Sequence, residues 1–164
     1  MEKAKLIVAV MYSDNHLLKA AIKKLGKKFG EAESESKEYP FNFTDYYAEE
    51  FGDNLLKKFL CFGRNISKED LPEVKKFTNN LEKLFAAGGK RRINIDPGYI
   101  DSKELVMASN KTASFKQSIA ENIFAHRLLE FNGKEAVIFR HTFADYKTDE
   151  NKNFFERIFC SFQK

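Results

Sequence analysis

The sequence predicts an α+β fold built around a hydrophobic core. Of its 164 residues, 43% are hydrophobic and 32% are charged, which is typical of a globular chain long enough to bury a core. Segments with strand-like and helix-like spacing of apolar residues follow in the order strand, helix, strand, strand, helix, strand. This order predicts a ferredoxin-like βαββαβ core over residues ~4–96. A short helix, a β-hairpin and a C-terminal helix extend it within a single domain, residues 1–164.

The predicted core begins with a buried strand and a helix. The run "LIVAVM", residues 6–11, is apolar and rich in branched side chains, which predicts a central strand buried on both faces. Ser13 or Asp14 is expected to cap a helix whose leucine, isoleucine and phenylalanine residues recur at helical spacing, opposite a row of lysines. Gly30 is expected to end this helix.

A loop and two strands are predicted next. The acidic stretch "EAESESKE", residues 31–38, is expected to be a mobile loop. In "YPFNF", residues 39–43, aromatic residues alternate with others, and Pro40 favours a strand at the edge of the sheet. After a long polar connection, "LLKKFLCF", residues 55–62, predicts the third strand, with a helix as the alternative for its first half.

The predicted core ends with a second helix and a fourth strand. Ser67, with Asp70 three residues later, weakly matches a capping box, and a Gly-Gly pair is expected to end the helix. "RRINI", residues 91–95, predicts a short strand with its isoleucines facing inward. Pro97 and Gly98 then suit a type II turn, in which proline fixes φ and glycine accepts a positive φ.

The remaining third of the chain predicts a short helix, a hairpin and a final helix. The helix is expected over residues 101–108. Residues 123–131 and 135–143 flank Asn132-Gly133, a strong signal for a two-residue hairpin turn, so His126 is expected to face Phe139. Asp149 is expected to cap a final helix with an apolar stripe rich in phenylalanine.

The formal charge of +4 is unevenly distributed. Residues 1–30 hold seven lysines and two acidic residues, whereas residues 31–53 hold eight acidic residues and one lysine. This pattern predicts a polarised surface. The chain is less basic than most nucleic-acid-binding proteins, so nucleic acid is not an expected partner.

The cysteines and the N-terminus predict a cytoplasmic protein. Cys61 and Cys160 lie in phenylalanine-rich segments without metal-binding spacing, which favours buried free thiols over a disulfide. The apolar run near the N-terminus has only about six residues, too few for a signal peptide or a membrane span.

No motif predicts a metal or a phosphate-binding loop. Histidines and carboxylates do not occur at a spacing that resembles a metal site. Gly88-Gly89-Lys90 lacks the earlier glycine of a P-loop, is followed by arginine and precedes a strand. No G-x-G-x-x-G sequence occurs. The histidines of the predicted hairpin have apolar neighbours and are expected to be core or interface residues, with a ligand role as the alternative. The sequence leaves the identity of any cofactor open.

The segment "RRINIDPGYI", residues 91–100, concentrates chemically versatile side chains. Strand alternation places Arg92, Asn94 and Asp96 on one face, opposite the isoleucines. A guanidinium binds carboxylate or phosphate through a planar donor fork, and an aspartate accepts hydrogen bonds or transfers protons. The alternative is a structural Arg–Asp or Asn–Asp network that closes the turn.

Two further segments share this character, "TDYY" after the second strand and "TFADYK" after the hairpin. If the second and fourth strands end at one edge of the sheet, "TDYY" and "DPGY" meet there. Asp45 and Asp96 are then candidate catalytic residues, although bonding of Asp45 to local backbone is an alternative. The predicted ligand-binding residues are Asp45, Tyr46, Tyr47, Arg92, Asn94, Asp96 and Tyr99, with Asp145 and Tyr146 as secondary candidates.

Four separated motifs, "MYSD", "PFNFTDYY", "RRINIDPGYI" and "TFADY" before "FFERI", together resemble an uncharacterised prokaryotic family, the domain-of-unknown-function family 4416. The resemblance spans nearly the whole chain and implies a small soluble protein without assigned chemistry, although some members are labelled GTP-binding proteins. One departure is "ASF", residues 113–115, where family members tend to have Ala-His-Arg. The matching positions are Thr44, Asp45, Tyr46, Tyr47, Arg92, Asn94, Asp96, Pro97, Gly98, Tyr99, Asp145 and Tyr146.

The expected function is binding of a small polar or anionic ligand, with a nucleotide as one candidate, at the rim of the sheet. The sequence leaves open whether a reaction follows binding. The alternative is a non-catalytic module that binds protein or RNA and forms a homodimer. No membrane partner is expected.

Overall fold

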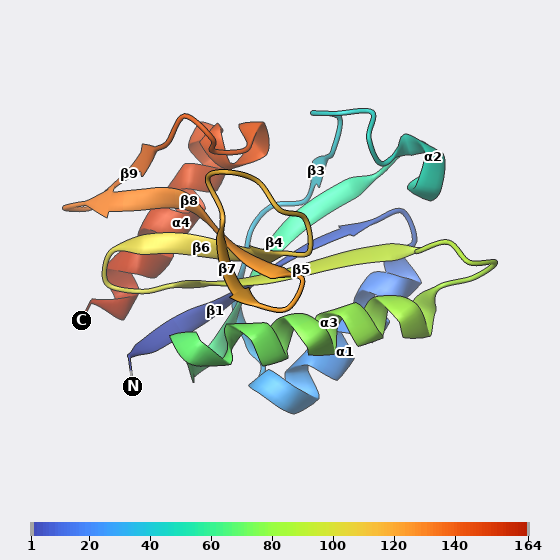
Figure 1. Ribbon diagram of the computed structural model, residues 1–164, viewed down its shortest axis with the longest axis horizontal. Coiled ribbons are helices and arrows are strands. Elements are labelled where there is room, and N and C mark those ends of the chain that lie inside the picture. The colour runs from blue at the N-terminus through green and yellow to red at the C-terminus, as the bar shows by residue number, and fades with distance from the viewer. Residues whose placement is uncertain (1, 164) are drawn as a thin grey trace.

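The computed structural model describes residues 2–163, which form an α+β structure with nine strands in one sheet and four α-helices (Figure 1). The α+β prediction is therefore confirmed. Two short 3₁₀ turns are labelled η. The elements are β1 Lys3–Tyr12, α1 Asn15–Phe29, β2 Ala32–Glu35, β3 Tyr39–Pro40, α2 Ala48–Phe51, β4 Leu56–Ser67, η1 Lys68–Asp70, α3 Leu71–Phe85, β5 Ile93–Ile100, β6 Glu104–Ser109, β7 Gln117–Ala120, β8 Ile123–Asn132, β9 Glu135–Ile138, η2 Ala144–Lys147 and α4 Asp149–Phe162.

The sheet has the strand order β2-β4-β1-β5-β6-β8-β7, while β3 pairs with β4 and β9 pairs with β8. Every pair of neighbouring strands is antiparallel. The predicted central strand is confirmed, because β1 pairs with β4 on one side and β5 on the other. None of the helices in the part of the chain described here is long and apolar enough to cross a membrane.

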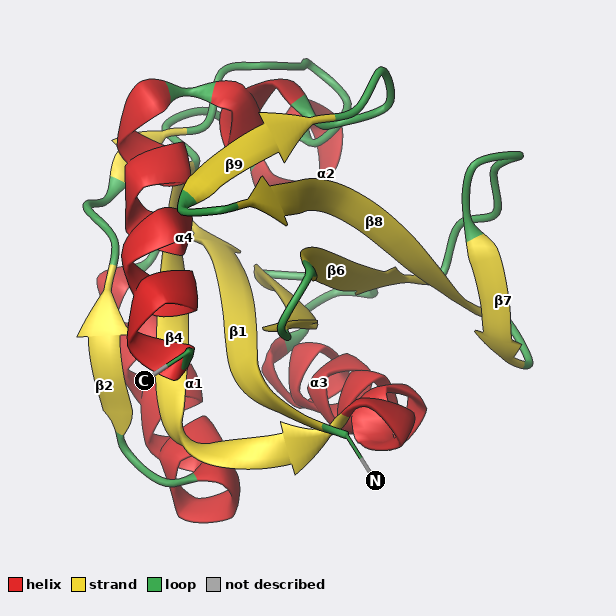
Figure 2. Ribbon diagram, turned by 90° about the vertical axis from the view of Figure 1, so that its left-hand side faces the viewer, coloured by secondary structure: helices red, strands yellow, loops and turns green. Residues whose placement is uncertain are grey.

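Helices cover both faces of the sheet (Figure 2). Leu6, Val8 and Val10 of β1 point into a core shared with α1 and α3. Ile7 and Ala9 point the other way, into a second core shared with α4. Successive strand residues face opposite sides, so burial on both faces requires the continuous apolar run that β1 has.

The predicted helix caps are largely confirmed. The Asp14 carboxylate accepts a hydrogen bond from the His16 backbone N–H at 2.8 Å, and α1 begins at the next residue after this cap. Ahead of α3, the Asp70 carboxylate accepts the Ser67 backbone N–H at 3.3 Å, as expected of a capping box. The cap of α4 lies one residue earlier than predicted, because the Thr148 hydroxyl accepts the Asn151 N–H at 3.2 Å.

The acidic segment 31–38 is not the loop that was predicted, because Ala32–Glu35 forms the edge strand β2. An edge strand tolerates charge, since one side of it faces solvent. Here the glutamates are also paired: Lys5 Nζ lies 2.7 Å from Glu33, and Lys58 Nζ lies 2.9 Å from Glu35. The strand expected over residues 39–43 shrinks to Tyr39–Pro40, after which the chain leaves the sheet.

The turn expected at Pro97-Gly98 is also wrong, because both residues lie inside β5. Gly98 has no positive φ and is needed for a different reason. A Cβ atom built on Gly98 would lie 2.3 Å from the Met107 sulfur and 2.3 Å from the Val106 carbonyl oxygen of β6. Glycine therefore permits the close approach of these two strands.

The helix expected over residues 101–108 is the strand β6, which pairs with β5 and β8. Its apolar residues contact two neighbouring strands, and this tertiary pairing overrides the local signal. The hairpin is confirmed with its turn moved by one residue, because Asn132 pairs with Glu135. His126 therefore does not pair with Phe139; it pairs with Met107 of β6.

Strands β5 and β6 remain together over only part of their lengths. They pair from Gly98 to Ile100, whereas β6 pairs with β8 from Glu104 to Ser109. The first half of β5 thus has β1 on one side and no strand on the other among the described residues. The sheet divides at this point, and the division creates the main cavity of the molecule.

Candidate functional site

A cavity of about 500 Å³ lies where β5 and β6 diverge. Its walls come from the start of β5, the end of β6, the aromatic segment 41–47, the loop 109–116 and η2. A volume of this size is in the range of small-molecule sites. Three strand ends meet beside the cavity. Tyr12, at the end of β1, pairs with Leu56 at the start of β4 and with Ile93 at the start of β5.

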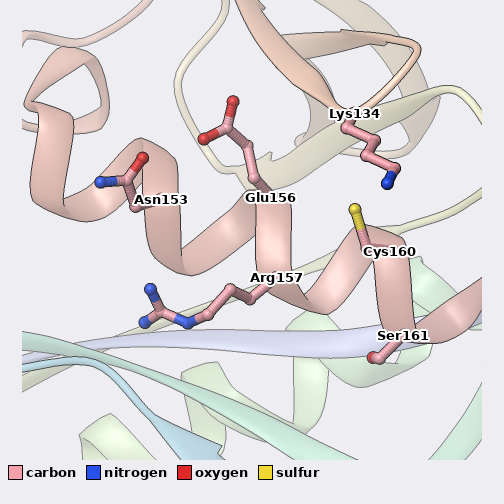
Figure 3. A pocket seen from close by; sticks show the side chains of 6 residues that line it. All are labelled: Lys134, Asn153, Glu156, Arg157, Cys160 and Ser161. Carbon is pink, nitrogen blue, oxygen red and sulfur yellow. The ribbon is translucent and has the colours of Figure 1, made fainter.

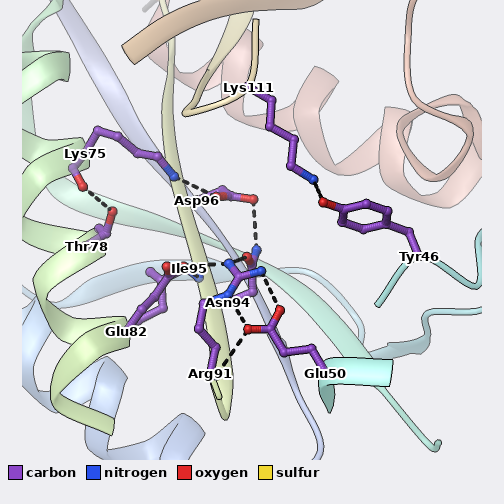
Figure 4. Close-up of polar contacts among 10 residues, drawn as sticks. All are labelled: Tyr46, Glu50, Lys75, Thr78, Glu82, Arg91, Asn94, Ile95, Asp96 and Lys111. Atoms are coloured by element: carbon purple, nitrogen blue, oxygen red, sulfur yellow. Dashed lines mark hydrogen bonds and ion pairs between the residues drawn. The ribbon is translucent and has the colours of Figure 1, made fainter. Parts of the chain in front are cut away.

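Asp96 lies on the β5 wall of the cavity with its carboxylate 34% exposed (Figure 4). It accepts hydrogen bonds from the Lys75 ammonium at 2.8 Å and from the Asn94 amide at 2.9 Å. Burial opposes its ionisation, but Lys75 and Asn94 hold the pKa of Asp96 below its usual value. Asp96 is therefore a fixed negative charge within the cavity at neutral pH.

A second carboxylate, Glu82 of α3, supplies the hydrogen-bond acceptor that a neighbouring strand would otherwise provide to this part of β5. Its oxygen accepts the Ile95 backbone N–H at 2.7 Å. Burial, together with the nearby Asp96 charge, raises the pKa of Glu82 to about 7. Arg91 completes this wall: its guanidinium donates to Glu50 at 2.8 Å and to Asn94 at 2.7 Å.

The opposite wall contains a buried ion pair between Lys57 and Asp145, 2.7 Å apart. The Tyr39 hydroxyl also donates to the Asp145 carboxylate at 2.7 Å. The Lys57 ammonium lies 5.0 Å from the centroids of the Phe41 and Tyr146 rings, which adds cation–π attraction. Burial, followed by the charge of Asp145, raises the pKa of Tyr39 far above its usual value, so the phenol remains a donor.

The mouth of the cavity is aromatic. Tyr47 packs against Phe41 and Phe51, while Tyr46 is 61% exposed. The Lys111 ammonium contacts the Tyr46 hydroxyl and lies 3.5 Å from the centroid of its ring (Figure 4). This contact joins segment 41–47 to loop 109–116 across the mouth.

His126 of β8 also lines the cavity, with only 1% of its surface exposed. Its Nε2 lies 3.2 Å from the His141 carbonyl oxygen, a contact that requires the proton on Nε2. Burial, and then the charge of Lys116, lowers the pKa of His126 to about 4. At neutral pH this imidazole is uncharged, and its Nδ1 is a hydrogen-bond acceptor.

The structure brings two thirds of the sequence-predicted candidates into one cavity. Asp45 is exposed and lies outside it. Arg92 also lies outside, because β5 begins only at Ile93; its guanidinium is 3.3 Å from Asp14 instead. Tyr99 faces the core beneath α1 and α3. Those that line the cavity are Tyr46, Tyr47, Asn94, Asp96, Asp145 and Tyr146.

The expected meeting of two strand ends is corrected by the strand directions. Strands β1 and β2, which α1 connects, are parallel to each other because both pair antiparallel with β4, which lies between them. Strands β4 and β5, which α3 connects, run in the opposite direction because both pair antiparallel with β1. The segment after β3 therefore approaches the start of β5, whereas the end of β5 lies at the opposite edge of the sheet. Tyr46 and Asp96 line one cavity for this reason.

Several cavity residues were missed by sequence reasoning. Lys75 and Glu82 carried a signal, because both are charged residues on the buried face of α3, seven positions apart. Arg91 was missed because strand alternation, counted from before the start of β5, selected Arg92 to share a face with Asn94 and Asp96. The missed residues with ionisable side chains are Lys57, Lys75, Glu82, Arg91, Lys111, Lys116 and His126.

A second hollow lies on the outer surface of α4 (Figure 3). It is lined by Lys134 and by five side chains of the helix, none of which is buried. Within residues 2–163, no group of three or more histidine, cysteine or acidic side chains is suited to hold a metal ion. The cavity between β5 and β6 is therefore the stronger candidate site.

Comparison with known proteins places the chain in a family. No curated protein and no solved structure gives a significant match. The family model described as domain of unknown function (DUF4416) matches residues 2–161 of the 164-residue chain, which confirms the resemblance drawn from the four motifs. Because this match covers nearly the whole length, the protein belongs to the DUF4416 family.

Proposed function

We propose that the protein binds a small polar, anionic ligand in the cavity between β5 and β6. The observation that carries this proposal is the charge of the cavity lining, where cationic side chains outnumber carboxylates by five to three. Such an excess attracts anions, and partial burial strengthens the attraction. The cations are Lys57, Lys75, Arg91, Lys111 and Lys116, and the carboxylates are Glu82, Asp96 and Asp145.

The aromatic mouth indicates that the ligand includes a planar group. Phe43, Tyr46 and Phe143 all line the cavity and remain 41%, 61% and 48% exposed. Exposed aromatic rings at a mouth offer stacking surfaces that a planar ligand would cover. A nucleotide or a fragment of one is a ligand of this kind, held here by ammonium groups and not by a glycine-rich loop.

We also infer that the first part of the chain has a ferredoxin-like βαββαβ core. In support, the strands joined by α1 and α3 have the order β2-β4-β1-β5, with every neighbouring pair antiparallel. Both helices pack on the same face of this half of the sheet. Such a core is the split βαβ arrangement, and β6 to β9 and α4 extend it.

The function is tested by a thermal-shift screen of nucleotides, nucleosides and small phosphorylated or carboxylated metabolites, each with and without magnesium. A ligand that binds only the folded state raises the melting temperature. Tyr46→Ser, which removes an exposed aromatic ring from the mouth of the cavity, is expected to reduce that rise, whereas Asp45→Asn and Arg92→Ala, which alter residues outside the cavity, leave it unchanged. A panel without any stabilising ligand, or hits reduced equally by Asp45→Asn, would contradict the proposal. Product analysis of each hit then shows whether the ligand is converted.

A second candidate function is binding of a protein partner through the same aromatic mouth. The observation that favours it is the number of large exposed aromatic side chains, to which Phe115 adds another that is 44% exposed. Sedimentation analysis of the protein tests the homodimer version. A concentration-dependent dimer that is abolished by Tyr46→Ser would favour this candidate over the small ligand.

A further inference from the structure

Two cations of the cavity differ from the other three in having no carboxylate partner. Lys57 pairs with Asp145, Lys75 pairs with Asp96, and Arg91 pairs with Glu50. Lys111 and Lys116 form no ion pair with any residue in the described part of the chain. The positive excess of the cavity therefore resides in these two lysines.

The hydrogen bonds of loop 109–116 position the Lys116 ammonium, whereas Tyr46 holds the Lys111 ammonium. The Lys116 ammonium donates to the Ser109 hydroxyl at 3.1 Å and to the Lys111 carbonyl at 3.0 Å. The Lys111 backbone N–H donates to the same Ser109 hydroxyl at 3.1 Å. The Lys116 side chain is thus folded back onto the Lys111 backbone and lines the cavity.

This arrangement is unfavourable while the cavity holds no anion. Two like charges repel, and the partial burial of Lys116 weakens the solvation of its ammonium, whereas Lys111 is exposed. Burial and the charge of Lys111 together lower the pKa of Lys116. The hydrogen bonds of both ammonium groups and the Tyr46 ring offset part of this repulsion but supply no negative charge, so the pair points to a ligand that supplies it.

We propose that loop 109–116 is an oxyanion subsite, in which the phosphate or carboxylate end of the ligand lies between the ammonium groups of Lys111 and Lys116. The inference rests on the proposed function and adds that the anionic end of the ligand lies at this loop. Ser109 orients the Lys116 side chain, and Tyr46 holds Lys111 until the oxyanion replaces its hydroxyl as the partner.

The other end of the ligand is specified by Asp96. Its ionised carboxylate is 34% exposed, already accepts two hydrogen bonds, and repels an oxyanion. It has lone pairs left for a ligand N–H or O–H donor. The ligand class is therefore a small molecule with an oxyanion at one end and a hydrogen-bond donor at the other.

Binding of defined probes tests the subsite. Phenyl phosphate, benzoate and phenol share a ring and differ in the anionic group, and inorganic phosphate lacks the ring. We expect phenyl phosphate, benzoate or both to bind more tightly than phenol. Whichever of the two anionic probes has the higher affinity shows whether the subsite prefers a phosphate or a carboxylate. Lys111→Gln and Lys116→Gln should each weaken this binding at least fivefold, whereas Lys23→Gln on the exposed face of α1 should leave the affinity unchanged.

The outcomes separate the subsite from the wider function. Anionic probes that bind wild type and both cavity-loop variants equally would refute the subsite while leaving ligand binding in place. If no probe and no metabolite of the wider screen binds, the proposed function fails and the subsite fails with it.

A measurement without ligand provides a second test. Because Lys116 is repelled by its neighbour, Lys116→Gln should raise the melting temperature of the ligand-free protein by about 2 °C. Lys75→Gln, which breaks an ion pair with Asp96, should lower it. A lower melting temperature in Lys116→Gln would show that the lysine is a structural residue, and would overturn the proposal.

Discussion

At the scale of single residues, the cavity holds charged groups that are expensive to bury alone. Lys57 and Asp145 are 8% and 3% exposed, and each neutralises the other. The same holds for Lys75 and Asp96 on the opposite wall. Breaking such a pair leaves an uncompensated charge in a region of low polarity, which costs far more than the pair contributes. These residues therefore restrict which substitutions the cavity walls tolerate.

Asp145→Asn should destabilise the protein strongly. The substitution keeps the shape of the side chain and its acceptor for Tyr39, but it leaves the Lys57 ammonium buried without a counter-charge. We expect the free energy of unfolding to fall by about 3–5 kcal/mol, as for other broken buried ion pairs. Urea denaturation measures this change. Asp45→Asn, at an exposed position, is the matched control and should change stability little. Equal effects of the two variants would show that the buried pair contributes nothing.

Glu82 should make stability depend on pH. Its pKa is raised from 4.5 to about 7 in the folded protein, so between these values the folded state holds a proton that the unfolded chain releases. The contribution of this group is therefore fully present below pH 4.5 and is lost as the pH rises through 7.

Glu82→Gln removes this dependence, because glutamine resembles the protonated acid and still accepts the Ile95 N–H. We expect the variant to exceed wild type in stability by roughly 1–3 kcal/mol at pH 8 and to match it near pH 5. Denaturation curves across this range provide the measurement, with the exposed Glu121→Gln as control. A constant difference at all pH values would show that Glu82 does not titrate in this range.

At the scale of elements, the divergence of β5 from β6 decides where the site lies. Pairing of the two strands stops at Gly98, and the freed N–H of Ile95 is satisfied by Glu82 of α3 instead of by a neighbouring strand. A buried backbone donor must find an acceptor, so the gap in the sheet requires a side chain at this position. The division of the sheet and the burial of a carboxylate therefore have the same origin.

Gly98→Ala should destabilise this junction. The new Cβ would lie 2.3 Å from the Val106 carbonyl oxygen, and a backbone atom cannot move aside without shifting β6. A loss of at least about 2 kcal/mol in the free energy of unfolding is expected from overpacking. Gly26→Ala is the control, because its Cβ would meet nothing within 4 Å and alanine is the better helix former, by up to about 1 kcal/mol. Similar stabilities of the two variants would mean that β5 and β6 are not packed as closely as described.

At the scale of the whole molecule, a sheet covered by helices on both faces carries a cavity where it divides. The walls come from segments more than 100 residues apart, such as Tyr39 and Asp145, whose side chains meet at 2.7 Å. Each wall is fixed by a different part of the core, because α3 supports one side and the β4 strand with η2 supports the other. The site is therefore supported by the same packing that stabilises the fold.

The features that depend on local spacing could be determined from the sequence alone. The apolar run of β1, the amphipathic patterns of α1, α3 and α4, and the caps at Asp14 and Ser67 involve residues within a few positions of one another. They do not determine the whole order of elements, because β2 was expected to be a loop and β6 was expected to be a helix. The motifs also identified Asn94, Asp96 and Asp145 as unusual polar residues near apolar strands.

Only the tertiary structure decided which of these polar residues share a site. Arg91 and not Arg92 reaches the cavity because β5 begins at Ile93, and that start is set by pairing with β1. Residues 104–109 are a strand because β5 and β8 offer them hydrogen-bond partners. Local sequence carries no information about partners that lie far along the chain, and the cavity consists almost entirely of such contacts.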